Sequence, residues 1–457
     1  MSIERPASDK RSYGRSAGLL TVALGIAGVL TYVFFAIASH SLDADQYGNI
    51  VILWSVVFLL ASTLFRPIEQ LLTRTLAERE QVGAESSDAL RSAAVIQGSV
   101  CLLAVLILFL ARNPIESELF DGEDALYWIL IASLLGFGLA YYARGFLAGR
   151  GQFRLYAALL VIEVSTRLVF AVAVAVGIAN GANFVALGIA TAPIAVIVVL
   201  PVAVLKRPEH NRPRLERPAP GASTQLTLGR GSAFAGAVLV MMLGEQVLIN
   251  SGALFVRAAE GAAAAGFIFN MMMVARAPLV LFQAIAASLL PHLTRLRTRG
   301  GDGSKAAFRS SIETTLLLIA AFSGLTVAGV VAIGPQVMQI AFGDTFEYDR
   351  LGLAIIAAGM GFYLAAASLN QAALAQAQAH RAAVRWILAA SLFGAINLAG
   401  VLSAERAVEI GFAASAALLA GLLYALYARP APSEDDVIEP GSARELQAQL
   451  TSTDEIV

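Results

Sequence analysis

Long apolar runs separated by short polar segments dominate the chain. Runs long enough to cross the roughly 30 Å hydrocarbon core of a bilayer fall at about residues 17–40, 49–66, 90–112, 125–147, 155–179, 182–205, 231–256, 263–291, 312–335, 351–377, 382–403 and 407–428. Backbone groups in lipid need hydrogen-bond partners within their own segment, so we expect helices rather than strands. The pattern predicts an all-α polytopic membrane protein with twelve transmembrane helices. The first run is too long for a secretion-signal core, so we expect it to be retained as a helix.

Basic residues between the apolar runs alternate in density along the chain. Twenty-six of the 32 Lys and Arg residues lie in the N-terminal arm, the even-numbered connections and the C-terminal tail. The opposite connections hold only four, namely Arg112, Arg257, Arg350 and Arg406. Lys and Arg accumulate on the cytoplasmic side of membrane proteins. We therefore expect a multi-pass protein of the bacterial cytoplasmic (inner) membrane with both termini cytoplasmic.

A proline- and arginine-rich segment divides the apolar runs into two sets of six. Residues 206–230 have the composition of an exposed, partly extended cytoplasmic linker. We expect an N-terminal six-helix lobe at 1–205 and a C-terminal six-helix lobe at 231–428. The tripeptide Leu-Thr-Arg follows both the second and the eighth run, which favours two parallel repeats, with chance similarity of so short a match as the alternative. Residues 429–457 are rich in acids and are expected to form a disordered cytoplasmic tail.

The composition argues against enzyme and nucleic-acid-binding classes. The chain is 58% hydrophobic and 14% charged with a net charge of −1, so no basic surface points to nucleic acid. The single cysteine, Cys101, lies within an apolar run, which excludes a disulfide framework. The four histidines form no metal-ligand spacing, and neither a phosphate loop nor a nucleophile elbow is present. We expect a transporter rather than an enzyme, with no metal and no cofactor.

Charged residues inside the apolar runs form the candidate site. Each costs roughly 2.5–3.5 kcal/mol at the centre of a membrane helix, so each needs a partner or a water-filled cavity. Glu163 and Arg167 share a run at i,i+4 spacing, which favours an ion pair. Glu245 and Arg276 are expected at similar depth on consecutive helices, where they are able to meet. The predicted substrate-binding residues are Arg66, Glu163, Arg167, Glu245, Asn270, Arg276 and Gln283.

Two interpretations of these residues stay open at the level of sequence. The glutamate and arginine side chains either line a cavity or form neutral pairs that merely orient helices, and Arg66 lies near enough to a membrane surface to extend toward water. Three arginines facing one interior would suit an anionic pyrophosphate, because guanidinium groups bind phosphate bidentately. Pro193, Pro278 and Pro335 are expected to break or bend their helices.

Two short segments resemble a known family. Leu42-Asp43-Ala44-Asp45-Gln46-Tyr47-Gly48, after the first apolar run, is similar to a turn of the Wzx-type oligosaccharide flippases of the MOP superfamily, relatives of the MATE drug exporters. The stretch 144–153, followed by Glu163 and Arg167, is similar to the helix 4–5 region of these flippases. The resemblance covers the whole chain in topology but only about 20 residues in motif.

The resemblance implies a two-lobed MATE-like carrier that works by alternating access. Its cargo would be an undecaprenyl-pyrophosphate-linked oligosaccharide, flipped for surface polysaccharide or lipopolysaccharide biosynthesis alongside other assembly proteins. Arg66, Arg167 and Arg276 would form its cationic cavity, and Glu245 lies where relatives place a carboxylate that couples to a cation, H⁺ or Na⁺.

Two other functions remain as alternatives to the flippase. The first is a MATE-like, cation-coupled exporter of drugs or metabolites, although residues 17–40 lack the acid that proton-coupled members carry in their first helix. The second is a membrane glycosyltransferase or polymerase. The short loops opposite the basic side leave little room for its catalytic groups.

Overall fold

A computed structural model describes residues 7–82, 86–205, 228–276, 302–344, 348–376 and 378–428, and those residues contain helices and no strands. The first set of elements is α1 (Ala7–Ser41), α2 (Ala44–Val82), α3 (Ser87–Leu110), α4 (Arg112–Pro114), the π-helical turn η1 (Ile115–Leu119), α5 (Asp124–Gly149), α6 (Phe153–Ala175), α7 (Ala182–Thr191), the 3-10 turn η2 (Ala192–Ile194) and α8 (Ala195–Leu205). The second set is α9 (Leu228–Asn250), α10 (Gly252–Glu260), a helix at Ala262–Arg276, α12 (Asp302–Phe342), α13 (Arg350–Ala375), α14 (Ala379–Leu398) and α15 (Ala404–Tyr427).

The all-helical membrane prediction is confirmed, whereas the number twelve stays a prediction. Ten helices in the described part of the chain are long and apolar enough to cross a membrane, or eleven if the bent pair α9–α10 is one span. The span expected at 263–291 begins as the helix Ala262–Arg276, and its remainder lies outside the described residues. Large apolar side chains on the outer faces of α3 and α12, such as Leu110 and Leu325, are exposed, as lipid-facing helices require.

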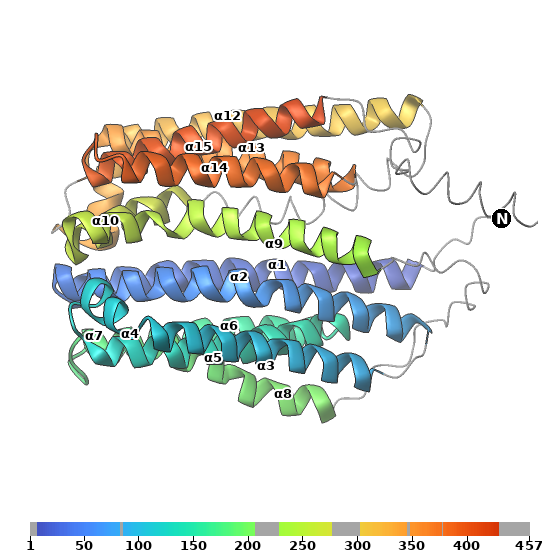
Figure 1. Cartoon of the computed structure of the whole chain (residues 1–457), viewed down its shortest axis with the longest axis horizontal. Coiled ribbons are helices and arrows are strands. Elements are labelled where there is room, and N and C mark those ends of the chain that lie inside the picture. The colour runs from blue at the N-terminus through green and yellow to red at the C-terminus, as the bar shows by residue number, and fades with distance from the viewer. Residues whose placement is uncertain are drawn as a thin grey trace, which may run out of the picture.

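The helices run side by side along one axis, as Figure 1 shows. Helices α1–α8 pack largely against one another, as do α9–α15, and the two groups meet where α2 lies beside α9 and α1 beside α12. We call these groups the first and second helix groups. The predicted linker and acidic tail fall almost entirely outside the described residues, so the domain boundaries stay a prediction.

Helix α2 extends well beyond the predicted end at residue 66. It continues through Pro67 to Val82 because Leu72 and Leu76 bury one face of the added turns against α5. Gly149 permits this approach, since a Cβ there would stand 2.7 Å from the Leu76 Cβ atom. The predicted charged loop after helix 2 is therefore helical at its start.

The three internal prolines behave differently from one another. Pro193 lies in η2, which separates α7 from α8, so the predicted break there is confirmed. At Pro335 the helix does not break, because α12 runs through that residue to Phe342, and a bend at Pro335 stays a prediction. A membrane helix tolerates the one backbone hydrogen bond that proline removes when neighbouring groups adjust. Pro278 lies outside the described residues.

The span predicted as continuous over residues 231–256 is instead broken. α9 ends at Asn250, and α10 begins at Gly252 after a bend of 47°. The Ser251 hydroxyl donates to the Val247 carbonyl at 2.6 Å, which satisfies the last turn of α9. Gly252 lets the bend pack closely on α15, since a Cβ there would lie 2.9 Å from Val408. We call the end of the bundle that carries α10 the α10 end.

An ion cluster at the α10 end ties α13 to α15. Asp349 caps α13 by accepting a hydrogen bond from the Gly352 N–H at 2.8 Å, and it pairs with Arg406. Arg406 also bonds Glu409 at 2.6 Å. Burial alone would raise the pKa of the Asp349 carboxyl, but the hydrogen bonds from Gly352 and Arg406 outweigh it and hold that pKa below its ordinary value.

Candidate functional site

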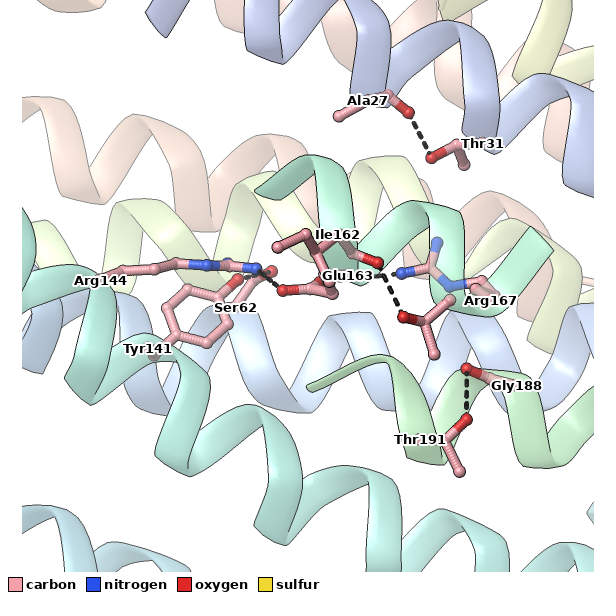
Figure 2. Close-up of polar contacts among 11 residues, drawn as sticks. Ala27, Thr31, Ser62, Tyr141, Arg144, Ile162, Glu163, Arg167, Gly188 and Thr191 are labelled. Carbon is pink, nitrogen blue, oxygen red and sulfur yellow. Dashed lines mark hydrogen bonds and ion pairs between the residues drawn. The ribbon is translucent and has the colours of Figure 1, made fainter. Parts of the chain in front are cut away.

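A buried charge network occupies the interior of the first helix group (Figure 2). Glu163 on α6 bonds Arg144 on α5, and its other oxygen lies 3.8 Å from Arg167 Nη2. All three residues are less than a tenth exposed. The intrahelical pair expected from i,i+4 spacing is therefore present, but Arg144 makes the shorter contact. Arg144 is one of the 26 basic residues that the charge pattern assigns to the even-numbered connections, and that assignment is wrong, because α5 continues to Gly149 and buries this side chain.

Arg167 is held by aromatic rings rather than by hydrogen bonds. Its guanidinium lies 4.4 Å from the centre of the Trp54 ring, and Phe34 and Phe58 also face it at 5.9 and 5.8 Å. The Nε and Nη1 groups have no hydrogen-bond partner among the described residues. A desolvated cation gains about 2 kcal/mol or more from such rings. The aromatic cage therefore favours a structural role for Arg167 in this state.

Arg66 occupies a different setting, between the two helix groups. It lies on α2, is solvent-exposed, and interacts electrostatically with Glu245 on α9 as well as with Glu69 on its own helix. Within the described part of the chain it makes no hydrogen bond or ion pair of its own. Its exposed side chain, with charged neighbours in both groups, therefore lies at the interface between them. Its N–H donors are available to a ligand.

A tyrosine hydroxyl holds each of the two glutamates near Arg66. Tyr156 on α6 donates to Glu69 Oε1 at 2.9 Å, and Tyr363 on α13 donates to Glu245 Oε1 at 3.0 Å. Glu69 also interacts electrostatically with Arg144. Neither Glu69 nor the two tyrosines are among the predicted substrate-binding residues, because nothing local in the sequence marks their contacts.

The sequence left a contact between Arg276 and Glu245 possible, but Arg276 does not contact Glu245 in the structure. Its Nη1 atom instead donates to Asn250 Oδ1 at 3.4 Å, and Asn250 in turn donates to Gln246 at 2.7 Å. Tyr363 interacts electrostatically with both Arg276 and Glu245, so it links the two residues indirectly. The Arg276 Nε group has no hydrogen-bond partner within the described residues.

The two helix groups are in tight contact at the α10 end. Gly48 on α2 approaches the backbone of the helix Ala262–Arg276 so closely that a Cβ would stand 1.9 Å from the Ala262 carbonyl oxygen. The adjacent Tyr47 donates its hydroxyl to Asn270, which is fully buried. Asn270 therefore joins the groups in this state, and its predicted role in substrate binding stays a prediction.

A charged contact closes the same end. Arg257 on α10 pairs with Asp121 Oδ1 at 2.6 Å and donates through Nε to the Leu119 carbonyl at 3.2 Å. Arg257 is buried, whereas the Asp121 side chain is half exposed. Asp121 adopts a left-handed φ of 54°, which presents the carboxylate to the other helix group. Nothing in the local sequence around Asp121 indicates Arg257 as its partner.

The described residues contain no cluster of three or more His, Cys, Asp or Glu side chains able to hold a metal ion. Gln283, the remaining predicted site residue, lies outside the described ranges. Within the described residues, Arg66 makes no hydrogen bond and has the electrostatic neighbours Glu69 and Glu245, and the Arg276 Nε has no partner.

Sequence comparisons find relatives of this chain but no family. No protein-family model matches the chain. Over 401 residues it is 25% identical to uncharacterized proteins of Mycobacterium tuberculosis and Mycobacterium bovis, across 83% of this chain and 86% of each relative.

Solved structures of MATE transporters superpose over most of the chain. An inward-facing multidrug resistance MATE family transporter of the MOP superfamily matches with a TM-score of 0.64 at 12% identity, covering 89% of this chain and 97% of that one. A eukaryotic MATE transporter reaches 0.61 at 15% identity, with 90% and 95% covered. An outward-facing MATE transporter of the MOP superfamily reaches 0.56 at 11% identity, with 90% and 94% covered. The chain therefore has the all-helical, multi-pass membrane fold of the MATE transporters of the MOP superfamily.

Proposed function

We propose that the protein is a membrane transporter that flips a lipid-linked oligosaccharide across the cytoplasmic membrane by alternating access. The cargo class is a polyprenyl pyrophosphate carrying a glycan for surface polysaccharide synthesis. The MATE-type fold supports a transporter, and the sequence resemblance to the Wzx-type flippases supports this cargo. A glycosyltransferase or polymerase is the less supported interpretation, because the loops opposite the basic side are short.

The observation that carries the proposal is the exposed Arg66 between the two helix groups. A diphosphate needs several N–H donors in a water-accessible space, and Arg66 offers its donors there. Arg276, from the second group, has a buried Nε with no hydrogen-bond partner among the described residues, and it would have to turn toward the head group to donate to it. A head group held by Arg66 and Arg276 would touch both helix groups at once, which is the condition for cargo to influence their separation.

The sidedness of the closed end fits entry of cargo from the cytoplasm. The positive-inside rule places the α10 end outside, and this end is sealed by the contacts of Gly48, Tyr47 and Arg257. The higher TM-score to an inward-facing than to an outward-facing MATE structure, 0.64 against 0.56, agrees with that placement. The glycolipid is made on the cytoplasmic leaflet, so an inward-open carrier is the state that would receive it.

Reconstitution tests the cargo directly. Proteoliposomes carrying the purified protein and a fluorescent polyprenyl-pyrophosphate disaccharide are expected to move the label between leaflets, as measured by quenching with a membrane-impermeant reductant. Arg66→Ala and Arg276→Ala should each slow flipping about tenfold or more, which corresponds to a rise of about 1.4 kcal/mol in the activation free energy. Arg309→Ala is the matched control, because Arg309 forms an exposed surface pair with Glu313. Full activity of both interior variants would remove these arginines from the site.

A deletion strain tests the same proposal in cells. Loss of the protein should deplete surface polysaccharide and cause lipid-linked repeat units to accumulate inside. Intact surface polysaccharide together with drug hypersensitivity would overturn the flippase proposal.

That outcome would favour the second candidate, a cation-coupled exporter. The specific observation for it is Glu245, a half-buried carboxylate bonded to Tyr363 in the second helix group. A proton or Na⁺ bound there would drive export of a drug or metabolite. Glu245→Gln should then abolish efflux of a fluorescent cationic dye from whole cells, whereas a flippase that does not use this ion would leave dye retention unchanged.

A further inference from the structure

Arg66 has two glutamate neighbours, and each glutamate accepts a hydrogen bond from a tyrosine. On its own side, Glu69 accepts a hydrogen bond from Tyr156 at 2.9 Å. On the opposite side, Glu245 accepts one from Tyr363 at 3.0 Å. Both carboxylates interact electrostatically with the Arg66 guanidinium, yet in the described residues neither forms an ion pair with it. The tyrosines therefore hold the two carboxylates near Arg66, while the N–H donors of its guanidinium stay unoccupied by either carboxylate.

The other charges around these two carboxylates differ in kind. Besides Tyr156 and Arg66, Glu69 has Arg144 and Glu163 within electrostatic reach. Glu245 accepts the hydrogen bond from Tyr363 and interacts electrostatically with Arg66. Arg66 is thus a cationic neighbour of Glu245 that belongs to the other helix group.

We infer that Glu69 and Glu245 are the resident counterions of Arg66 in the empty carrier, and that the anionic head group of the cargo displaces them from this role. The inference rests on the proposed function for the identity of the anion, a diphosphate. A carboxylate held by a tyrosine partly neutralises the charge of Arg66 without contacting it. It therefore lowers the free-energy cost of keeping an unpaired arginine inside the membrane. It leaves the N–H donors of Arg66 open to an incoming phosphate.

Displacement also changes the attraction between the helix groups. The Arg66–Glu245 attraction acts across their interface, because α2 and α9 lie side by side there. A diphosphate bound to Arg66 repels Glu245 and cancels this attraction. Anion binding would therefore weaken the tie between the groups on the side of the bundle away from the α10 end. Glu245 would act as a specificity-determining residue, since a neutral or cationic ligand would gain nothing by displacing it.

The test is the affinity of purified protein for a diphosphate lipid. Farnesyl diphosphate serves as the probe, farnesol controls for binding of the hydrocarbon tail, and dissociation constants are measured in detergent by calorimetry. Glu245→Gln keeps the size and the hydrogen bond from Tyr363 but removes the competing charge, so it should bind farnesyl diphosphate about tenfold more tightly than wild type. Glu69→Gln should act in the same direction. Glu313→Gln, at an exposed surface pair, is the matched control and should bind like wild type.

A double-mutant cycle makes the counterion role specific. Arg66→Ala alone should weaken binding about tenfold or more, and adding Glu245→Gln to it should bring no further gain. Equal affinities of wild type and Glu245→Gln, with both binding the diphosphate, would overturn the counterion inference and leave the proposed function standing. A gain from Glu245→Gln that persists in the Arg66→Ala background would also overturn it. Failure of both proteins to bind farnesyl diphosphate more tightly than farnesol would instead overturn the proposed function, and the inference with it.

Discussion

The contact between Gly48 and Ala262 makes a sharp prediction about how the carrier opens. A methyl group on Gly48 would stand 1.9 Å from the Ala262 carbonyl oxygen and 2.2 Å from its carbon. Ordinary carbon–oxygen contacts are about 3.3 Å or longer, so the two backbones must separate by roughly 1.4 Å. Neither atom belongs to a flexible side chain, so the strain is not relieved by a rotamer change.

The cost of Gly48→Ala falls on the state in which the α10 end is closed. Overpacking in a close-packed interior costs about 1–3 kcal/mol, and a coupling of that size shifts a two-state equilibrium by about 5–150-fold. Once the α10 end opens, the added methyl group meets no obstacle. We therefore expect the variant to populate the state open at the α10 end far more than wild type.

Spin-label distances measure this shift. Cys101→Ser removes the only native cysteine, and labels at Ile178 and Val401, which are 81% and 83% exposed at the α10 end, report the separation of the two helix groups. Gly48→Ala should move the distance distribution to longer values. Gly98→Ala is the matched control, because a Cβ on Gly98 meets nothing within 4 Å. An unchanged distribution in Gly48→Ala would refute the argument that this backbone contact maintains closure.

Three further predictions follow from the ion pairs. Arg257→Ala should open the α10 end more than Asp121→Asn in the same spin-label assay, because Arg257 is buried and also bonds a backbone carbonyl, whereas Asp121 is half exposed; the reverse order would contradict this. Arg144→Met should lower the free energy of unfolding in detergent by about 3–5 kcal/mol, because it removes the closest partner of the Glu163 carboxylate. Adding Glu163→Met should recover part of this loss, and no recovery would argue against a buried ion pair. The pKa of Asp349 is below its ordinary value, so its charge stabilises the fold at neutral pH, and this stabilisation is lost as the pH falls below about 4. The melting temperature of Asp349→Asn should therefore depend less on pH over that range than the melting temperature of the wild type. Equal pH dependence of the two melting temperatures would contradict a stabilising charge on Asp349.

Local sequence was sufficient for some features of the site. The i,i+4 spacing of Glu163 and Arg167 forms a pair because a helix brings such positions together whatever surrounds it. The η2 break at Pro193 is likewise local, since proline lacks the N–H that the helix needs. The same rule gives no break at Pro335, where the surrounding helix continues.

Other features depend on which helix faces meet. Nothing near Arg144 in the sequence predicts Glu163 as its partner, because the contact requires α5 and α6 to pack with a particular rotation. The same holds for Tyr156 with Glu69 and for Tyr363 with Glu245. Each of these hydrogen bonds joins residues far apart in the chain, so hydrophobic periodicity carries no information about it.

The amino-acid sequence by itself determined that this is an all-helical membrane protein with charges inside the bilayer. That follows because apolar length and backbone hydrogen bonding in lipid leave the chain almost no alternative. Only the tertiary structure decided which charges are neutralised and which are free. It buried Arg167 in an aromatic cage and left Arg66 exposed between two tyrosine-held carboxylates. The energy of a charge in a membrane depends on the groups that packing brings around it, and helix packing depends on contacts across the whole chain.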